Sequence, residues 1–270
     1  MKKTLISVLL TAVLAAGLFG CSAQRKDEPE ADLPVLSIGV DNEYEPYSYM
    51  SDTGELVGSD IELAREACRR IGYQPVYKPI QWDRKNDYLA DGTIDCVWSC
   101  FTYTGREKEY LWAGPYLYSR QVIVVKSDSD ITECMQLTGK RVAVMSSTKP
   151  EELLLENADG TSVPKVSEIL SFANLDLAFT AMRRGYADAV VGHESAMRQL
   201  IDSMSEDYRM LESSLQQVEV GVAFRKDGDA ALVSKLNDAL QEMAQDGTTE
   251  TIIERYGLDA ENVIKGEQNG

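Results

Sequence analysis

Arg106 is the residue of this chain whose type and position most directly suggest binding chemistry. It lies in a polar loop that follows the apolar segment Cys96–Trp98. A guanidinium grips a carboxylate through two parallel, charge-assisted hydrogen bonds. The alternative is a surface arginine that pairs with Glu107 or Glu109. The favoured interpretation is a carboxylate site with Arg106 as its anchor.

Thr148 marks a second candidate anion site. It precedes the start of a predicted helix over residues 151–156. The backbone N–H groups at the start of a helix have no partner within the helix and suit an anion. The alternative is that Thr148 serves only as a helix cap.

The sequence gives little support for a metal site. Its only histidine is His193, and besides Cys21 it has the four cysteines Cys68, Cys96, Cys100 and Cys134. No cysteine pair has the two-residue spacing of a zinc knuckle. Four cysteines allow three disulfide pairings, although small buried apolar residues are the favoured interpretation. We expect neither a metal nor a cofactor.

Strand and helix patterns alternate along the chain and must position these residues. The predicted strands are 35–40, 76–77, 96–98, 141–145, 189–191 and 218–224. Helices are predicted over 59–71, with Ser59 as the N-cap, and over 85–90, 151–156, 175–184 and 230–245. This alternation predicts an α/β fold of mostly parallel sheets flanked by helices.

A motif that occurs twice in the chain suggests two similarly built halves. Gly92 to Asp95 and Gly185 to Asp188 share the spacing Gly-x-x-Asp, and each closes a helix and opens a strand. Chance similarity of helix-stop signals is the alternative. Ligands of parallel sheets gather at the carboxyl ends of strands, so the loops 99–106 and 192–194 are expected to face each other across a cleft.

The first residues predict export. Lys2 and Lys3 precede an apolar run from Leu5 to Leu18, which has signal-peptide length and is too short for a membrane span. The run ends at Cys21, in a context that resembles a bacterial lipobox; an ordinary signal peptide is the alternative. We therefore expect residues 1–20 to be a lipoprotein signal peptide, Cys21 to carry acyl chains such as palmitate, and residues 21–34 to be a tether. The expected location is the extracytoplasmic face of the cell membrane.

The charge of the chain limits its partners. The formal net charge is −17, and removal of the two lysines of the leader makes it about −19. Nucleic acid and anionic lipid repel such a chain, so neither is expected as a partner. We expect a monomer.

Several motifs, taken in order and spacing, resemble those of the extracytoplasmic solute-binding proteins of polar amino acid ABC transporters. The resemblance covers nearly the whole chain after the leader. It rests on Gly39-x-Asp41-x-x-Tyr44-x-Pro46-Tyr47, Gly54 to Ala64, Trp82, Leu89-x-x-Gly92-x-x-Asp95, Thr102-x-Thr104-x-Arg106, Gly114-Pro115-Tyr116, Leu137 to Val144, Gly185-x-x-Asp188-Ala189 and Gly221 to Asp227.

The resemblance implies roles for individual residues. It assigns the ligand α-carboxylate to Arg106, aided by Thr104 and the Ser99 region, and to Thr148 from the second lobe. It also places Tyr44 over the ligand side chain and Asp41 near the ligand or hinge. Alternatively, Tyr44 only packs and Asp41 only caps a turn. Trp82 and Tyr47 are expected either to line the pocket or to pack in the core of the lobe. The expected binding residues are Asp41, Tyr44, Trp82, Ser99, Cys100, Thr104, Arg106, Ser147, Thr148, His193 and Glu194.

Two positions depart from the family pattern. Only Gly105 separates Thr104 from Arg106, where the family usually has one more residue; glycine can absorb the altered backbone path. His193 stands where the family commonly has an aspartate that receives the ligand α-amino group. A neutral histidine offers no negative charge. Three alternatives follow. Glu194 receives the α-amino group instead, the ligand lacks a standard α-amino group, or His193 is only a loop residue.

The resemblance implies a hinged clamshell of the periplasmic type II kind. Lobe 1 is expected over 35–118 and 222–270 and lobe 2 over 119–221, with hinge crossings at its ends. The expected function is capture of an amino acid or similar small carboxylate by lobe closure and delivery to an ABC permease, without enzymatic activity. The alternatives are an enzyme on the same scaffold, such as a dehydratase, and a ligand-sensing ectodomain.

Overall fold

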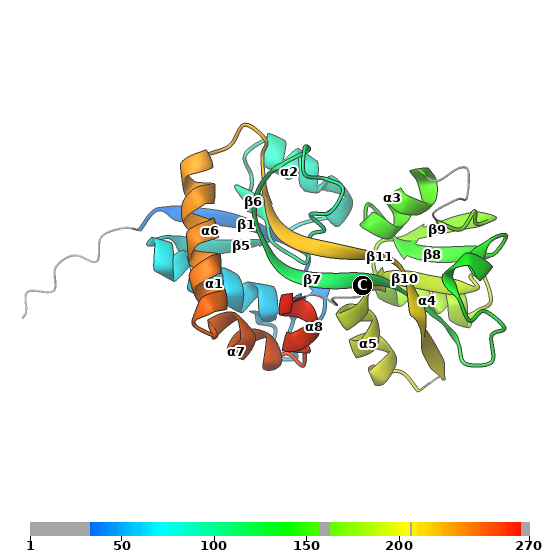
Figure 1. The fold of residues 1–270 in the computed structure, drawn as a ribbon. Helices are drawn as coiled ribbons and strands as arrows, with labels where there is room; N and C mark the ends of the chain where they lie inside the picture. Colours follow the sequence, from blue (N-terminus) through cyan, green and yellow to red (C-terminus); the bar gives the residue numbers. More distant parts are fainter. Residues whose placement is uncertain (1–32, 157–162, 206, 266–270) are drawn as a thin grey trace, which may run out of the picture. The chain divides into compact units, whose positions relative to one another are not determined.

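Two long strands, β7 (Leu111–Lys126) and β11 (Tyr208–Phe224), organise the structure (Figure 1). This computed structural model describes residues 33–156, 163–205 and 207–265. The predicted leader, Cys21 and most of the predicted tether lie outside the described residues. No helix in the described ranges has the length and apolar character needed to cross a bilayer.

The main sheet has eight strands in the order β5-β1-β6-β11-β7-β10-β8-β9. The remaining strands of this sheet are β1 (Val35–Val40), β5 (Gln74–Pro79), β6 (Cys96–Val97), β8 (Arg141–Met145), β9 (Glu168–Phe172) and β10 (Ala189–His193). Pairs β5-β1, β1-β6, β10-β8 and β8-β9 are parallel, whereas β7 and β11 pair antiparallel with each other and with their neighbours. A small second sheet joins β2 (Glu43–Tyr44), β3 (Ser48–Met50) and β4 (Leu56–Val57). The predicted α/β class is confirmed.

Helices cover both ends of this sheet. They are α1 (Ser59–Ile71), α2 (Lys85–Ala90), α3 (Lys149–Glu156), α4 (Leu175–Arg183), α5 (Glu194–Ser203), α6 (Ala230–Gln245), α7 (Thr248–Glu254) and α8 (Ala260–Lys265), with short 3-10 turns η1 (Trp82–Arg84) and η2 (Cys134–Leu137). Helix α6 has the predicted bounds. It buries Val233, Leu236 and Met243, and Asp229 caps its first N–H groups.

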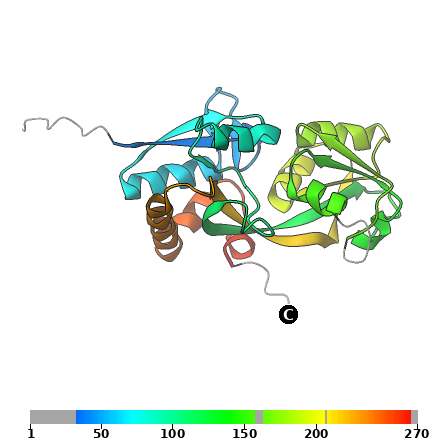
Figure 2. The ribbon, with the colours of Figure 1, turned by 90° about the horizontal axis from the view of Figure 1, so that it is seen from above.

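Figures 1 and 2 show two groups of elements, which we call lobes 1 and 2. Lobe 1 contains β1, β5, β6, α1, α2, α6, α7 and α8, and lobe 2 contains β8, β9, β10, α3, α4 and α5. Strands β7 and β11 run between them. The predicted lobe boundaries fall inside these two strands, where Arg120 pairs with Gln217 and Ser119 with Val218. Movement of one lobe against the other stays a prediction.

Ser59 is not the N-cap of α1; that prediction was wrong by one residue. Ser59 is the first helical residue, and Gly58 is the cap, at φ 136°. The Ser59 and Asp60 N–H groups donate to Pro46 O and Tyr47 O, so backbone replaces a side-chain cap. A Cβ at Gly58 would lie 2.1 Å from Tyr47 O, so only glycine permits this close approach.

The two Gly-x-x-Asp corners have the same structure. Gly92 and Gly185 both have positive φ, at 74° and 77°. Asp95 N donates to Ser37 O and Asp95 Oδ2 accepts from Ser37 N, at 2.8 and 2.7 Å. Asp188 makes the same two contacts with Arg141, both at 2.8 Å. Each aspartate therefore joins the strand it opens to the neighbouring parallel strand of its own lobe.

Candidate functional site

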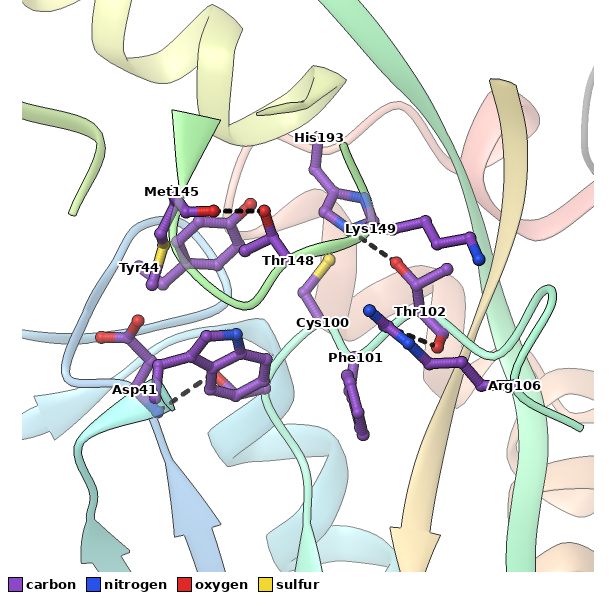
Figure 3. Close-up of a pocket in the computed structure, with 12 residues that line it drawn as sticks. Asp41, Tyr44, Cys100, Phe101, Thr102, Arg106, Met145, Thr148, Lys149 and His193 are labelled. Atoms are coloured by element: carbon purple, nitrogen blue, oxygen red, sulfur yellow. Dashed lines mark hydrogen bonds between the residues drawn. The ribbon is translucent and has the colours of Figure 1, made fainter. Parts of the chain in front are cut away.

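A pocket lies between the lobes, where strands of both end (Figure 3). Asp41 follows β1 and the loop from Ser99 to Arg106 follows β6, whereas Met145 and His193 end β8 and β10. The lining residues are Asp41, Tyr44, Trp82, Ser99, Cys100, Phe101, Thr102, Arg106, Met145, Thr148, Lys149 and His193. Carboxyl ends of parallel strands thus meet here, as expected for a ligand site in such sheets.

Arg106 is buried in this pocket, with 7% of its surface exposed. Its Nε and Nη2 lie 3.0 and 2.7 Å from Glu152 Oε2, which belongs to α3 of lobe 2. Its Nη1 donates weakly to Thr102 O at 3.4 Å, and its Cζ lies 5.1 Å from the Phe101 ring centre. Glu152 therefore occupies the Nε edge of the guanidinium, and the Nη1–Nη2 edge retains N–H groups for a carboxylate.

Two lysines add positive charge beside Arg106. Lys149 is 5% exposed and pairs through Nζ with Glu152 Oε1. Lys85, equally buried, donates to Ser147 O at 3.0 Å across the lobes. Burial, with a further contribution from Arg106, lowers the pKa of Lys85 to about 8. The cluster of Lys85, Arg106 and Lys149 thus favours an anion.

Gly105, between Thr104 and Arg106, leaves room for one of these lysines. Gly105 has φ 80°, a region that glycine enters without strain. A Cβ at this position would lie 2.6 Å from Lys149 Nζ. The glycine therefore both shapes the loop and lets the ammonium approach its backbone.

His193 is an uncharged wall of the pocket. Its Nε2 lies 3.1 Å from both Thr102 Oγ1 and Gln121 Nε2. Its ring also makes edge contacts with Tyr44 and Tyr47. Burial first, and then the Arg106 charge, lower the pKa of His193 to about 3. At neutral pH the ring therefore carries no charge.

Asp41 supplies the carboxylate among the lining side chains. Its Oδ1 accepts from Glu43 N at 2.9 Å, and its N–H donates to Ser99 Oγ at 3.2 Å. Burial raises the pKa of Asp41 to about 6. Ser99 Oγ also lies 2.6 Å from Ser48 Oγ, so the serine links β1 to the second sheet as well as lining the pocket.

Most of the expected binding residues come together, and three do not. The pocket is lined by Asp41, Tyr44, Trp82, Ser99, Cys100, Arg106, Thr148 and His193. Ser147 is placed beside it, with its carbonyl oxygen on Lys85. Thr104 and Glu194 line a separate cavity. There, Thr104 Oγ1 accepts from Glu219 N, and Glu194 pairs with Arg120 and Arg198.

Tyr47 packs in the core instead of lining the pocket. It is 1% exposed and its ring stacks on Tyr44 with centroids 5.8 Å apart. Among the described cysteines, Cys68, Cys96 and Cys100 are buried free thiols and Cys134 is a partly buried one, which agrees with their interpretation as small apolar residues.

Sequence reasoning missed four lining residues: Phe101, Thr102, Met145 and Lys149. Thr102 stands in the motif that pointed to Arg106, and Lys149 directly follows Thr148, so proximity to predicted residues was an available signal. Met145 was identified as the end of a strand. Phe101 gave no signal beyond its place in the loop. No group of three or more His, Cys, Asp or Glu suited to a metal occurs in the described part of the chain.

Comparisons with known proteins agree with this geometry. The model of the family "Bacterial extracellular solute-binding proteins, family 3" matches residues 36–259. The L-cystine-binding protein TcyA of Bacillus subtilis (strain 168) is 30% identical over 271 residues, which cover 95% of this chain and 97% of that protein. The L-cystine-binding protein TcyJ of Escherichia coli (strain K12) is 29% identical over 225 residues, 82% of each.

A solved structure extends the likeness to three dimensions. An ancestral arginine-binding protein bound to arginine has a TM-score of 0.74 and 29% identity, over 83% of this chain and 99% of that chain. The fold is therefore that of the two-lobed periplasmic binding proteins of type II. The chain belongs to the bacterial extracellular solute-binding proteins of family 3.

Proposed function

We propose that this solute-binding protein captures a small carboxylate-bearing ligand, such as an amino acid, by closing its lobes around it. The observation that carries this proposal is a buried arginine in a pocket lined by both lobes. Glu152 occupies the Nε edge of this guanidinium, and a ligand carboxylate fits the N–H groups of its Nη1–Nη2 edge. Arg106 is thus the anchor of the ligand carboxylate.

Side-chain hydrogen bonds that join lobe 2 to the segment around β2 support closure as the binding step. Asn174 Nδ2 donates to Glu43 Oε2 at 2.7 Å, and Gln199 Nε2 donates to Glu45 Oε1 at 3.0 Å. These bonds join lobe 2 to Glu43 of β2 and to Glu45, which directly follows β2. A ligand that touches both lobes binds best when they are closed, so it shifts the population toward the closed form. Strands β7 and β11 are the proposed hinge.

Delivery to an ABC permease and attachment to the membrane belong to the same proposal. The family is extracellular, and its relatives include binding proteins for amino acids. Acylation of Cys21 would tether the chain at the extracytoplasmic face, where a closed, loaded form would meet the permease. Mass spectrometry of the mature protein, with a diacylglyceryl-modified Cys21 as its first residue, is the test of this part.

We propose binding rather than catalysis at this site. The residues that a dehydratase could use as acid or base are poorly suited to that role. Glu194 lies outside the pocket, and its ion pairs with Arg120 and Arg198 help to keep its pKa below the ordinary value. The pKa of His193 is lowered to about 3, so the ring is neutral at physiological pH and is a weak base.

A thermal-shift screen tests the proposed function. Purified protein without its leader is heated with amino acids and small carboxylates, one at a time. A ligand that binds only the folded form adds about 2.7 kcal/mol of stability at a concentration one hundred times Kd. We expect a rise in Tm with at least one carboxylate and none with its amide or ester. Equal stabilisation by acid and amide would contradict the anchor role of Arg106.

A further inference from the structure

Arg106 is held from two sides, by its own lobe and by lobe 2. On the side of lobe 1, its carbonyl oxygen accepts from Trp112 Nε1 at 3.0 Å, and its Nη1 lies 3.4 Å from Thr102 O. On the other side, its Nε and Nη2 reach a single oxygen, Glu152 Oε2 on α3, at 3.0 and 2.7 Å. The ion pair with Glu152 therefore joins the proposed anchor of the ligand to the opposite lobe.

Glu152 is itself held by its own helix. Lys149, three residues earlier on α3, pairs through Nζ with Glu152 Oε1, the oxygen that does not face Arg106. Arg106 and Lys149 are 7% and 5% exposed, whereas 22% of the Glu152 side chain is exposed. Figure 3 shows the two cations at the same end of the pocket. The charge of Glu152 is thus shared between two cations, which limits its repulsion of a ligand carboxylate.

A neighbouring contact between the lobes differs in kind. Lys85 of lobe 1 donates through Nζ to Ser147 O of lobe 2 at 3.0 Å, and also to Trp82 O of its own lobe at 3.3 Å. Its acceptors are backbone carbonyls, whereas Arg106 and Glu152 are both charged. Charge-assisted hydrogen bonds are about twice as strong as neutral ones. The Arg106–Glu152 pair is therefore the stronger of these two contacts.

Opening of the lobes would separate Arg106 from Glu152, because the two residues belong to opposite lobes. The guanidinium would keep its contact with Thr102 O and would lose both bonds to the carboxylate. The closed form is thus stabilised by an interaction within the chain, in addition to the contacts that a ligand makes. The observed affinity of a ligand is its affinity for the closed form, reduced by the fraction of molecules that can close. Glu152 can therefore change the affinity without touching the ligand.

We propose that Glu152 is a positioning residue for ligand capture, which orients the Arg106 guanidinium from the opposite lobe and keeps the loaded form closed. The basis is a carboxylate that lies between Arg106 and Lys149 and reaches the anchor across the lobes. By occupying the Nε edge, it leaves the Nη1–Nη2 edge for the ligand carboxylate. This inference rests on the proposed function, since it takes Arg106 as the anchor and closure as the binding step.

Ligand binding by Glu152→Gln protein tests the inference. Glutamine keeps the size of the side chain but has one acceptor oxygen, so it cannot accept from both Arg106 and Lys149. The probes are the standard L-amino acids, L-lactate and succinate, and the one that binds wild type most tightly is used with each variant. Calorimetry measures the affinity, and stopped-flow fluorescence measures the rates of association and dissociation.

We expect Glu152→Gln to bind the probe about tenfold more weakly than wild type, since a charge-assisted contact is lost. The loss should arise from faster dissociation, because the ion pair must break when the closed form opens. Glu156→Gln is the matched control. It removes the same charge from the exposed end of the same helix and should keep the wild-type affinity. Glu152→Asp, whose carboxylate is one methylene shorter, should also dissociate faster, and it decides the question if the glutamine variant does not fold.

The outcomes separate this inference from the proposed function. If Arg106→Ala abolishes binding while Glu152→Gln binds as tightly as wild type or more tightly, the proposed function stands and the positioning role of Glu152 is wrong. A loss of affinity that comes from slower association alone would also overturn that role. If no probe binds to wild type, or if Arg106→Ala leaves the affinity unchanged, the anchor assignment fails and this inference fails with it.

Discussion

The two lobes share a corner and differ in the loops that follow it. In both, a glycine with positive φ ends a turn, and an aspartate makes two bonds to the neighbouring strand. The strand that follows leads to Arg106 in lobe 1 and to His193 in lobe 2. The loop after β6 therefore brings a guanidinium to the pocket, and the end of β10 brings a neutral ring. The repeated corner positions the strands, and the chemistry of the pocket comes from the residues at and after their ends.

The largest expected effect comes from the anchor of lobe 1. Arg106→Ala should weaken binding of the ligand by about 2–5 kcal/mol, because a buried carboxylate would lose its charged partner. Titration calorimetry measures this loss. Arg84→Ala is the control, since Arg84 is exposed and pairs with Asp87 outside the pocket. Affinities that fall equally in both variants would remove the distinction between anchor and surface arginine.

The corners are expected to matter for stability. Asp95→Ala and Asp188→Ala should each lower the free energy of unfolding by about 1–3 kcal/mol, because a backbone N–H of the neighbouring strand loses its acceptor. The loss should be larger for Asp188, whose carboxylate also pairs with the Arg141 guanidinium at 2.7 Å. Urea unfolding measures both. A large loss of unfolding free energy for one variant and none for the other would show that the two corners do not have the same structural role.

The pH dependence should have opposite signs in the two lobes. His193 of lobe 2 has its pKa lowered to about 3, whereas burial raises the pKa of Asp60 in lobe 1 to about 7. The unfolded chain takes up a proton on His193 below about pH 6.5 while the folded ring stays neutral, so stability falls on acidification. For Asp60 the folded state binds the proton first. Its contribution is complete below the unfolded pKa of about 3.9 and is lost as the pH rises through about 7.

Unfolding free energies at pH 5 and pH 8 check these signs. His193→Asn should lose less stability than wild type on going from pH 8 to pH 5, by on the order of 2 kcal/mol. Asp60→Asn should gain less than wild type over the same interval. Identical profiles for wild type and both variants would show that neither residue titrates differently in the folded state.

The smallest effect is expected at Gly105. Gly105→Ala should cost about 1 kcal/mol of stability, because alanine is strained at φ 80°. Gly54→Ala is a matched control, since Gly54 has φ 79° and no heavy atom near its added Cβ. Only Gly105→Ala should also alter ligand affinity, by displacing Lys149 Nζ. Equal ligand affinities in the two variants would show that Gly105 has no influence on the pocket.

Local sequence signals identified part of the regular elements, whereas strands β2, β3, β4 and β9 and helices α5, α7 and α8 were not predicted. The strands at 35–40 and 141–145 and the helices at 85–90 and 230–245 have the predicted bounds. In these segments apolar periodicity or a capping residue acts within a few positions of the chain.

Long-range pairing is what the sequence did not reveal. The strand β7 was not predicted, and β11 starts ten residues earlier than its predicted start at Val218. Both contain polar residues where they pass between the lobes, and they form strands because they pair with each other. In the site, Arg106 was predicted from its loop. Its pairing with Glu152 depends on a contact between lobes, which no local pattern encodes.

The central claim is that the lobes close around a carboxylate held by Arg106. Small-angle scattering with and without a ligand from the thermal-shift screen tests it most directly. The account predicts a smaller radius of gyration on ligand addition for wild type and no change for Arg106→Ala at the same ligand concentration. An unchanged radius in saturated wild-type protein would contradict it.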